Sequence, residues 1–173
     1  MLISLRCRVC SGGSAVNSAF TMGCALDSIS STSSCTGSLL MPMVEEALRW
    51  DPPIQCTYRR ATQDDRIEGV EVKAGEMVIP MWAGANWDPE VFPNPEQFDI
   101  DRPTTKPHMG FGFGPHFCAG AELARLEAKI AFEELLRRLG DIKLDEAESD
   151  LSHLPSFASH GYQKIGLSFT RVD

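Results

Sequence analysis

The sequence predicts an α+β protein that is mainly helical. Two segments, residues 39–50 and 120–140, carry apolar residues at helical spacing, and each stops at a residue that ends helices. Between them, residues 57–82 alternate apolar and polar side chains in short runs, and a similar run closes the chain. We therefore expect two long helices accompanied by short β-strands.

The composition is that of an ordinary globular domain. The 173 residues, 43% hydrophobic and 23% charged, leave room for one domain. The formal net charge is −8 and no run of lysine or arginine marks a phosphate-binding stripe, so nucleic acid is not an expected partner. No stretch approaches about eighteen consecutive apolar residues, so we expect no membrane partner.

Residues 1–38 differ from the rest of the chain. They are rich in Ser, Gly, Thr and Cys, nearly lack charge and show no period of a helix or strand. We interpret 1–38 as a disordered or non-native N-terminal segment and 39–173 as the folded part. Cys7 and Cys10 lack a second cysteine pair and a nearby histidine, so a zinc module here is a minor alternative. Because charges interrupt any signal-peptide pattern, free thiols in a cytoplasmic location are expected.

The first predicted helix, "LLMPMVEEALRW", places Met43, Ala47 and Trp50 on one side and ends at Asp51-Pro52-Pro53. The next segment, residues 57–82, predicts two or three strands, with turns at Glu68-Gly69 and Ala74-Gly75.

An irregular stretch and a second helix follow. Residues 86–107 contain five prolines and several Asp and Asn turn signals, which predict a wandering segment without regular structure. The segment "GAELARLEAKIAFEELLRRLG" predicts a helix that ends at Gly140, with Leu123, Leu126 and Ile130 in one apolar row. The tail "IGLSFTRV" predicts a final strand.

The loop "FGFGPHFCAG" places Cys118 just before this second helix. The unpaired N–H groups of a helix N-terminus stabilise a negatively charged sulfur, and the glycines allow close approach of the backbone. These features favour an anionic sulfur beside a large apolar group. From residue chemistry alone, a buried inert cysteine remains an equal alternative. A phosphate-binding loop is disfavoured, because the G-K-[ST] ending and the G-x-G-x-x-G spacing are both missing.

The spacing Phe111-x-x-Gly114-x-x-x-Cys118-x-Gly120 resembles the haem-binding signature of the cytochrome P450 family. Three further features agree, in the order found in that family: Glu46-x-x-Arg49 resembles its K-helix motif, "FPNPEQFDIDRP" its meander, and "GAELARLE" the start of its L helix. The resemblance covers roughly residues 40–173 and is greatest to soluble bacterial members. It implies the C-terminal half of a cytochrome P450 fold, with K helix, small β-sheet, meander, cysteine loop and L helix.

The resemblance also implies roles for individual residues. Cys118 would be the thiolate ligand of the iron of haem b. Glu46, Arg49 and Arg102 would form a buried network that holds the meander and the cysteine loop. His116 and Arg59 would contact the haem propionates, with Arg60 as the rival of Arg59. We also expect propionate contact from His108, with Phe111, Gly114 and Gly120 shaping the loop. Trp87 departs from the family pattern, since relatives commonly carry arginine there.

The implied activity is that of a monooxygenase, which inserts one oxygen atom from O2 into a small organic substrate. Electrons would come from NAD(P)H through a reductase and a ferredoxin-like donor, which Lys106, Arg125 and Lys129 would help attract. Family members are typically more than twice as long, and nothing upstream of Glu46 resembles their oxygen-activating pattern A-G-x-[DE]-T. The chain is therefore expected to be truncated, and the alternative is a non-catalytic haem-binding fragment or remnant. Substrate-facing candidates lie at residues 53–55 and 157–158.

Overall fold

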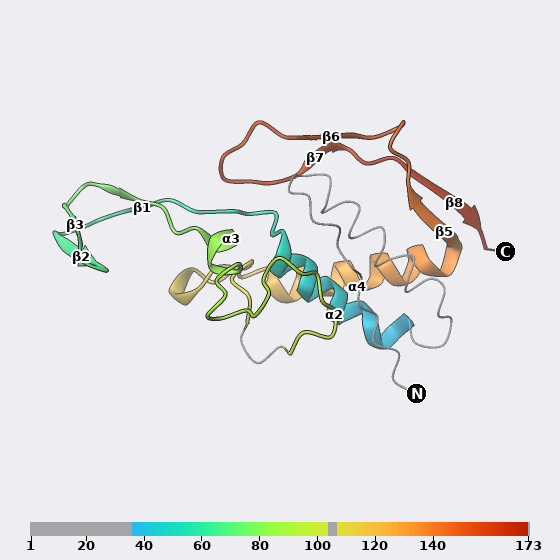
Figure 1. Cartoon of the computed structure of the whole chain (residues 1–173), viewed down its shortest axis with the longest axis horizontal. Coiled ribbons are helices and arrows are strands. Elements are labelled where there is room, and N and C mark those ends of the chain that lie inside the picture. The colour runs from blue at the N-terminus through green and yellow to red at the C-terminus, as the bar shows by residue number, and fades with distance from the viewer. Residues whose placement is uncertain (1–35, 104–106, 173) are drawn as a thin grey trace.

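A computed structural model of the chain describes residues 36–103 and 107–172. Two helices form its centre: α2 (Thr36–Trp50) and α4 (Ala121–Arg138), which run side by side (Figure 1). Among the described residues, the buried apolar cluster between the helices consists of residues from α2 and one aromatic residue from the meander: Leu40, Met43, Val44 and Phe98. From α4, the side chains of Ala128, Phe132 and Leu136 pack against it. The helix predicted from residue 39 is present and begins at Thr36.

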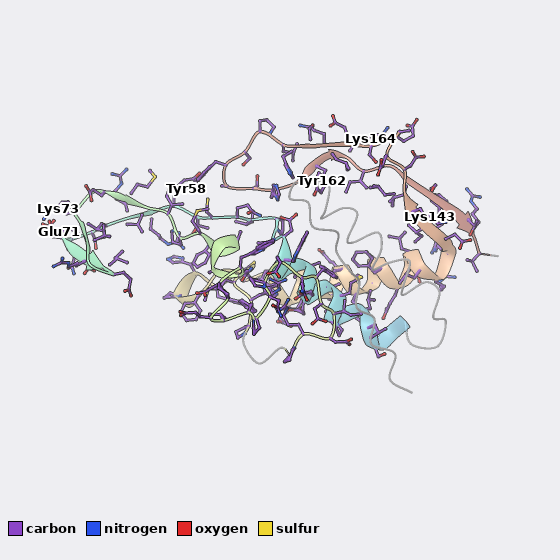
Figure 2. The ribbon with its side chains drawn as sticks, viewed as in Figure 1. Tyr58, Glu71, Lys73, Lys143, Tyr162 and Lys164 are labelled. Atoms are coloured by element: carbon purple, nitrogen blue, oxygen red, sulfur yellow. The ribbon has the colours of Figure 1, made fainter. Side chains whose placement is uncertain are left out.

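Four short strands form an arm that extends from this centre (Figure 1). β1 (Arg59–Arg60) pairs with β4 (Met77–Val78), and β2 (Asp65–Ile67) pairs with β3 (Val70–Val72), both antiparallel. Figure 2 shows Glu71 and Lys73 at the outer end of the arm. The predicted β-structure is therefore present as two successive strand pairs, and it stops short of residue 82.

Both predicted turns of the arm have the backbone that their sequence suggests. Glu68 and Gly69 have φ values of 46° and 84°, the paired positive values that tight hairpins need. Gly75 has φ 90°. The Glu68-Gly69 turn fixes the register of β2 and β3, because it joins these two paired strands. Gly75 lies between β3 and β4, which pair with β2 and β1 respectively.

The segment after the arm contains the short helix α3 (Trp82–Ala85), which was not predicted. From Asn86 to Pro103 the described chain then has only turns and bends, as expected for the meander. After residues 104–106, which lie outside the described part, the chain enters the cysteine loop. There the 3₁₀ helix η1 (Gly114–His116) leads into α4.

The second long helix ends at Arg138 rather than at the predicted Gly140. Leu139 already has an extended backbone and begins β5 (Leu139–Leu144), which pairs with β8 (Leu167–Arg171). Strand pairing therefore ends the helix before the glycine is reached. A second pair, β6 (Asp150–His153) with β7 (Tyr162–Lys164), lies beside it (Figure 1). Of these four strands, only β8 was predicted.

The apolar residues of α4 are divided between two faces. One face packs against α2, whereas Leu123, Leu126 and Ile130 are more than half exposed. The predicted apolar row is thus not the row that forms the core within the described residues. No helix among those residues is long and apolar enough to cross a membrane.

The prediction that residues 1–38 are disordered or non-native lies outside the described residues, except for the first turn of α2. The minor zinc alternative at Cys7 and Cys10 lies outside them too. Among the residues that the structure does describe, no group of three or more His, Cys, Asp or Glu side chains is arranged to hold a metal ion.

Candidate functional site

The cysteine loop is closed by its own backbone. The Cys118 N–H donates to the Phe111 carbonyl at 3.0 Å, and the Phe117 N–H donates to the Gly114 carbonyl at 2.9 Å. Gly112 and Gly114 have φ values of 75° and 74°, which residues with a side chain rarely adopt. The glycines therefore permit the tight path that folds the loop back on itself before α4.

Cys118 is exposed and lies two residues before Gly120, the N-cap of α4. Helix N-termini carry a partial positive charge, which stabilises negative charge on a nearby sulfur. The aromatic side chains on either side of η1, Phe113 and Phe117, are 71% and 49% exposed. An exposed sulfur with exposed aromatic neighbours at a helix N-terminus suits a large, apolar cofactor bound through that sulfur. The structure thus disfavours the alternative of a buried, inert cysteine.

Gly120 is the glycine nearest to the sulfur. A Cβ at Gly120 would lie 3.9 Å from the Cys118 Sγ, whereas a Cβ at Gly114 would meet nothing within 4 Å. A side chain at position 120 would therefore stand next to the sulfur. Gly114, by contrast, is required by its backbone conformation rather than by space.

The two predicted propionate partners lie on different elements. His116 closes η1 and is exposed. Arg59 lies on exposed β1, and its Nη1 donates to the neighbouring Tyr58 carbonyl at 3.0 Å. The guanidinium of its rival, Arg60, reaches across the arm to the Gly75 carbonyl at 2.7 Å. Within the described part of the chain, the Arg59 guanidinium is thus bound only to its sequence neighbour, and this side chain is the freer of the two to turn toward a ligand.

His108 has partners other than the predicted propionate. Its side chain is 7% exposed, with Nε2 3.0 Å from the Glu45 Oε2. Its Nδ1 accepts the Gly110 N–H, also at 3.0 Å. Both ring nitrogens are thus engaged inside the protein, which leaves neither directed toward a ligand carboxylate.

Glu46, Arg49 and Arg102 meet in one buried network. Arg49 donates to both carboxylate oxygens of Glu46 at 2.8 Å, and the Arg102 Nε lies 3.1 and 3.3 Å from the same oxygens. Their exposed fractions are 5% for Glu46, 2% for Arg49 and 11% for Arg102. One carboxylate therefore holds two guanidinium groups from segments 53 or more residues apart in sequence.

The remaining donors of the network reach the meander backbone. Arg102 donates to the carbonyls of Pro93, Asn94 and Gln97 at 2.6 to 3.2 Å. Arg49 adds bonds to the Asn86 and Gln97 carbonyls, and the Asp99 N–H donates to Glu46. A segment without helix or strand thus receives its shape from α2, which explains how it is ordered without a ladder of its own.

Sequence reasoning missed Glu45 as a partner of the cysteine loop. Its carboxylate accepts from Arg125 on α4 at 2.6 and 3.0 Å, in addition to its contact with His108. The hydrogen bond from His108 and then the contacts with Arg125 lower the pKa of Glu45 to about 2. Glu45 and Arg125 are 80 residues apart, and no local pattern indicates that they meet.

The cations predicted to attract an electron donor are partly paired with carboxylates of the protein itself. Arg125 is 25% exposed and ion-paired with Glu45 and Glu122, so its charge is largely neutralised. Lys129 is 48% exposed and lies 3.9 Å from Glu133. Lys106 lies outside the described residues. Among the three, Lys129 is the described cation most open to a partner.

Asn86 is a second residue that the sequence did not indicate. It is fully buried, and its Oδ1 accepts the Met109 N–H at 2.6 Å, so it joins the end of α3 to the start of the cysteine loop. The neighbouring Trp87, which departs from the family pattern, donates its indole N–H to the Trp50 carbonyl at the end of α2, at 2.8 Å. The substitution therefore retains a side-chain donor at this position.

The two segments expected to face a substrate lie together. The Gln55 N–H donates to the Ala158 carbonyl and the His160 N–H donates to the Pro53 carbonyl, each at 2.8 Å. Phe157 is 67% exposed beside them. A side-chain contact between His160 Nδ1 and Asp51 Oδ1 at 2.6 Å joins the same two segments.

A family model matches this chain over most of the part that the structure describes. The model, described as Cytochrome P450, covers residues 38–159. The matched range contains α2 except its first two residues, the meander, the cysteine loop and α4. It therefore includes Cys118 and the network of Glu46, Arg49 and Arg102.

Two curated proteins illustrate the similarity. The biotin biosynthesis cytochrome P450 of Bacillus subtilis is 40% identical over 131 residues, which cover 76% of this chain and 32% of that protein. The steroid C26-monooxygenase of Mycolicibacterium smegmatis is 45% identical over 133 residues, with the same two shares. The chain thus spans about a third of the length of the curated relatives it matches.

Solved structures agree with this fold. Cytochrome P450 CYP109Q5 from Chondromyces apiculatus matches with a TM-score of 0.79 and 37% identity, over 90% of this chain and 39% of that one. P450BioI in complex with an acyl carrier protein ligated to hexadec-9Z-enoic acid matches with a TM-score of 0.75 and 34% identity, over 90% of this chain and 41% of its own. The expected arrangement of a mainly helical fold with small sheets is therefore confirmed.

Proposed function

The chain belongs to the cytochrome P450 family, and we propose that it supplies the haem-binding part of a monooxygenase that inserts one oxygen atom from O2 into a small organic substrate. The family implies haem iron, held by a cysteine thiolate. The observation that carries the proposal is the exposed Cys118 at the N-terminus of α4, in a loop closed by its own backbone. We assign residues 39–173 to this haem-binding part and leave 1–38 outside it.

The residues around Cys118 fit a haem. The thiol is accessible and lies at the positive end of a helix, and Phe113 and Phe117 offer exposed aromatic surface that a porphyrin would cover. When bound, haem b supplies iron that activates O2, and a thiolate ligand favours cleavage of the O–O bond. In this proposal Cys118 is the iron ligand, and Phe111, Gly114 and Gly120 give its loop the required shape.

The haem propionates need donors. His116 at the end of η1 and Arg59 on β1 are exposed and are our candidates for them. Because both nitrogens of His108 are already engaged, we assign it to positioning the loop instead of binding a propionate. Glu46, Arg49 and Arg102 hold the meander against α2, which fixes the segment that leads into the cysteine loop.

The substrate and the electron donors belong to the proposal as well. Structures similar to this chain hold testosterone in one relative and an acyl carrier protein ligated to a fatty acid in another, so the substrate class is a small, mainly apolar organic molecule. Residues 53–55 and Phe157 are the described residues that we expect to face it. We expect electrons from NAD(P)H to arrive through a reductase and a ferredoxin-like donor, in the cytoplasm.

A carbon monoxide spectrum of the reduced protein tests the assignment of Cys118. The chain is purified with added haem, reduced and exposed to carbon monoxide, and the position of the Soret band is recorded. We expect the red-shifted band of a thiolate-ligated haem, and its loss in Cys118→Ser. If the band persists in that variant, Cys118 is not the ligand.

A second candidate function is haem binding without turnover. It is favoured by the exposure of Cys118, Phe113 and Phe117, since no element among the described residues covers them. Catalysis by this family's chemistry requires a dry pocket, because water diverts reactive intermediates. Product formation from a fatty acid or steroid with NADPH, ferredoxin and reductase would support the first function. A thiolate-type band without product would support the second.

A further inference from the structure

Glu45 joins three parts of the protein at one carboxylate. It lies on α2, it accepts two hydrogen bonds from Arg125 on α4, and its Oε2 lies 3.0 Å from the Nε2 of His108 at the start of the cysteine loop. Its side chain is 26% exposed, so solvent only partly screens these contacts. The residue is therefore placed to act on the loop from two directions.

The first direction passes through His108. The Nδ1 of His108 accepts the Gly110 N–H, so this nitrogen carries a lone pair and no proton. The remaining ring proton is then on Nε2, which donates to Glu45. The two contacts together select the neutral tautomer with its proton on Nε2, because the other tautomer would set one N–H against the Gly110 N–H.

Gly110 is packed so closely that its hydrogen bond to the His108 Nδ1 has little room to change. A Cβ added to Gly110 would lie 2.8 Å from the Leu48 carbonyl oxygen and 3.0 Å from the Nδ1 of His108. The backbone at Gly110 therefore lies directly against both α2 and the imidazole ring. A change in the tautomer or orientation of the His108 ring would therefore displace the Gly110 backbone.

The second direction passes through Arg125. Its guanidinium carbon lies 4.7 Å from the centre of the Phe111 ring, in the range of a cation–π contact. The Phe111 carbonyl in turn accepts the Cys118 N–H at 3.0 Å. The carboxylate of Glu45 holds the Arg125 guanidinium with two hydrogen bonds. It thereby also restrains the Phe111 ring, which the guanidinium contacts.

We propose that Glu45 is a positioning residue for Cys118: it fixes the tautomer of His108 and the placement of Arg125, and through them the two adjacent loop residues Gly110 and Phe111. The chemical purpose of this positioning rests on the proposed function, since it keeps the sulfur where a haem iron would be bound. The contact of Arg125 with Glu122 does not share this role, because Glu122 is 90% exposed and, among the described residues, forms an ion pair with that arginine alone.

The tautomer can be measured in the unaltered protein. In the ¹⁵N-labelled chain at neutral pH, long-range ¹H–¹⁵N correlations distinguish a protonated from an unprotonated ring nitrogen, with His116 as the exposed internal reference. We expect His108 to have a proton on Nε2 and none on Nδ1. A ring proton on Nδ1, or rapid averaging of the two nitrogens, would overturn the proposal, and no variant has to fold for this outcome to count.

Amide exchange then tests the positioning itself. In Glu45→Ala we expect the Gly110 and Cys118 amides to exchange at least about tenfold faster, the change that follows when hydrogen bonds to a charged group are lost. Glu45→Gln should lie between this variant and the wild type, because its side-chain oxygen still accepts from His108 but its NH2 group opposes Arg125. Glu122→Gln is the matched control, since it removes another carboxylate from the same arginine. Exchange at both amides that is equal in the Glu45 and Glu122 variants would overturn the proposal.

The haem-loaded chain gives an independent spectroscopic signature. With carbon monoxide, Glu45→Ala should show a smaller share of the thiolate-type band than the wild type, and Glu122→Gln an unchanged share. If the wild type shows no thiolate-type band, the proposed function fails. The exchange and tautomer measurements on the haem-free chain still decide whether Glu45 positions the loop.

Discussion

At the scale of single residues, the most constrained charge is that of Glu46. Its carboxylate is 5% exposed and forms ion pairs with both Arg49 and Arg102, which are themselves buried or nearly so. Removing ions from water is costly, so such a group persists only where partners compensate it. The guanidinium donors that remain are bound by main-chain oxygens of the meander, and this leaves each charge fully engaged.

We expect Glu46→Ala to destabilise the protein by about 3–5 kcal/mol, because two arginines lose the carboxylate that compensates their burial. This is a large part of the total stability of an ordinary domain, so the midpoint of urea unfolding is expected to fall markedly. Urea unfolding followed by circular dichroism measures the loss.

Glu134→Ala is the matched control for that variant. Glu134 also pairs with two arginines, Arg137 and Arg138, but on the exposed face of α4. Its removal should change stability by less than about 1 kcal/mol. Equal effects of the two substitutions would contradict the importance of burial for the Glu46 network.

The depressed pKa of Glu45 makes a definite contribution to the acid sensitivity of the fold. The pKa falls from 4.5 to about 2 in the folded protein because the side chain accepts from His108 and Arg125. A carboxylate of this kind adds stability at pH values above about 4.5, and the contribution is lost as the pH falls toward 2. The shift corresponds to at most about 3 kcal/mol, less with the screening that partial exposure allows.

Glu45→Gln should therefore lose stability relative to the wild type at pH 6, and the difference between the two proteins should shrink as the pH falls from 5 to 3. Urea unfolding at several pH values measures the difference. Because Glu134 and all other acids are present in both proteins, their titration cancels. A difference that stays constant over this range would show that the ionised form of Glu45 is not stabilised by the fold.

Residues whose role depends on local spacing could be predicted, whereas residues whose partners are distant could not. Cys118 and the glycines around it lie within ten residues, so their pattern is readable in the sequence. The partners of His108, by contrast, include Glu45, which is 63 residues away. Its predicted contact with a propionate rested on its place near the cysteine loop in the sequence, and only the folded arrangement shows that both its nitrogens are engaged.

At the scale of elements, the cysteine loop and α2 are fitted to each other at Gly110. Any side chain there would overlap the Leu48 carbonyl and the ring of His108. Gly110→Ala should therefore destabilise the protein by about 1–3 kcal/mol, the usual cost of overpacking, and should speed amide exchange along the loop.

Gly84→Ala in α3 is the control for that substitution. A Cβ at Gly84 meets the Met81 Cβ at an ordinary 3.6 Å, and alanine is the better helix former. We expect a neutral or slightly stabilising effect in thermal unfolding. If both alanine variants behaved alike, close packing at Gly110 would not be the reason why glycine is needed there.

The hairpin formed by β6 and β7 is attached to the end of α2 through His160. Its Nδ1 contacts Asp51 at 2.6 Å, and its ring stacks on His153 with centroids 3.7 Å apart. His160→Ala should loosen this attachment by about 1 kcal/mol and make the Gln55 amide, which donates to Ala158, exchange several-fold faster.

Ser152→Ala tests whether that effect is specific. The Ser152 hydroxyl bonds Asp150 within the same hairpin and does not reach α2. Hydrogen exchange at Gln55 should be unchanged by it. Faster exchange in both variants would mean that the hairpin is sensitive to any change and that His160 has no special part in the attachment.

Elements differ in how far their sequences specify them. The arm was predictable, because Glu68-Gly69 and Ala74-Gly75 mark turns by residue type alone. β5 was not, since Leu139 and Gly140 continue a helical pattern and become extended only because β8 pairs with them. Strands defined by a partner nearly thirty residues further along the chain leave little trace in local periodicity.

At the scale of the whole molecule, the main question of packing is which apolar residues of α4 enter the core and which face solvent. The sequence shows a single broad apolar surface along this helix, but the fold divides it. Phe132 and Leu136 pack on α2, while Leu126 is 53% exposed. Which side of a helix becomes the core depends on the helix that meets it, and this could not be predicted from α4 alone.

Because the apolar residues of α4 are divided in this way, replacing leucine by alanine should cost much more stability on one face than on the other. Leu136→Ala removes contacts with the core cluster of α2 and should destabilise the protein by about 2 kcal/mol, in the lower part of the range for leucines in cores. Leu126→Ala removes a largely exposed side chain and should change stability by less than about 0.5 kcal/mol. Urea unfolding measures both.

The exposed face should also bind a hydrophobic dye. Leu123, Leu126 and Ile130 form a continuous row more than half exposed to solvent, and such rows bind apolar probes and promote association. Leu126→Ser should therefore reduce fluorescence of bound ANS and raise the protein concentration at which light scattering first appears, whereas Leu136→Ser should increase ANS binding by loosening the core. If Leu126→Ser left dye binding unchanged while Leu136→Ser reduced it, the two faces of α4 would have the reverse assignment, with Leu136 on the side that meets solvent.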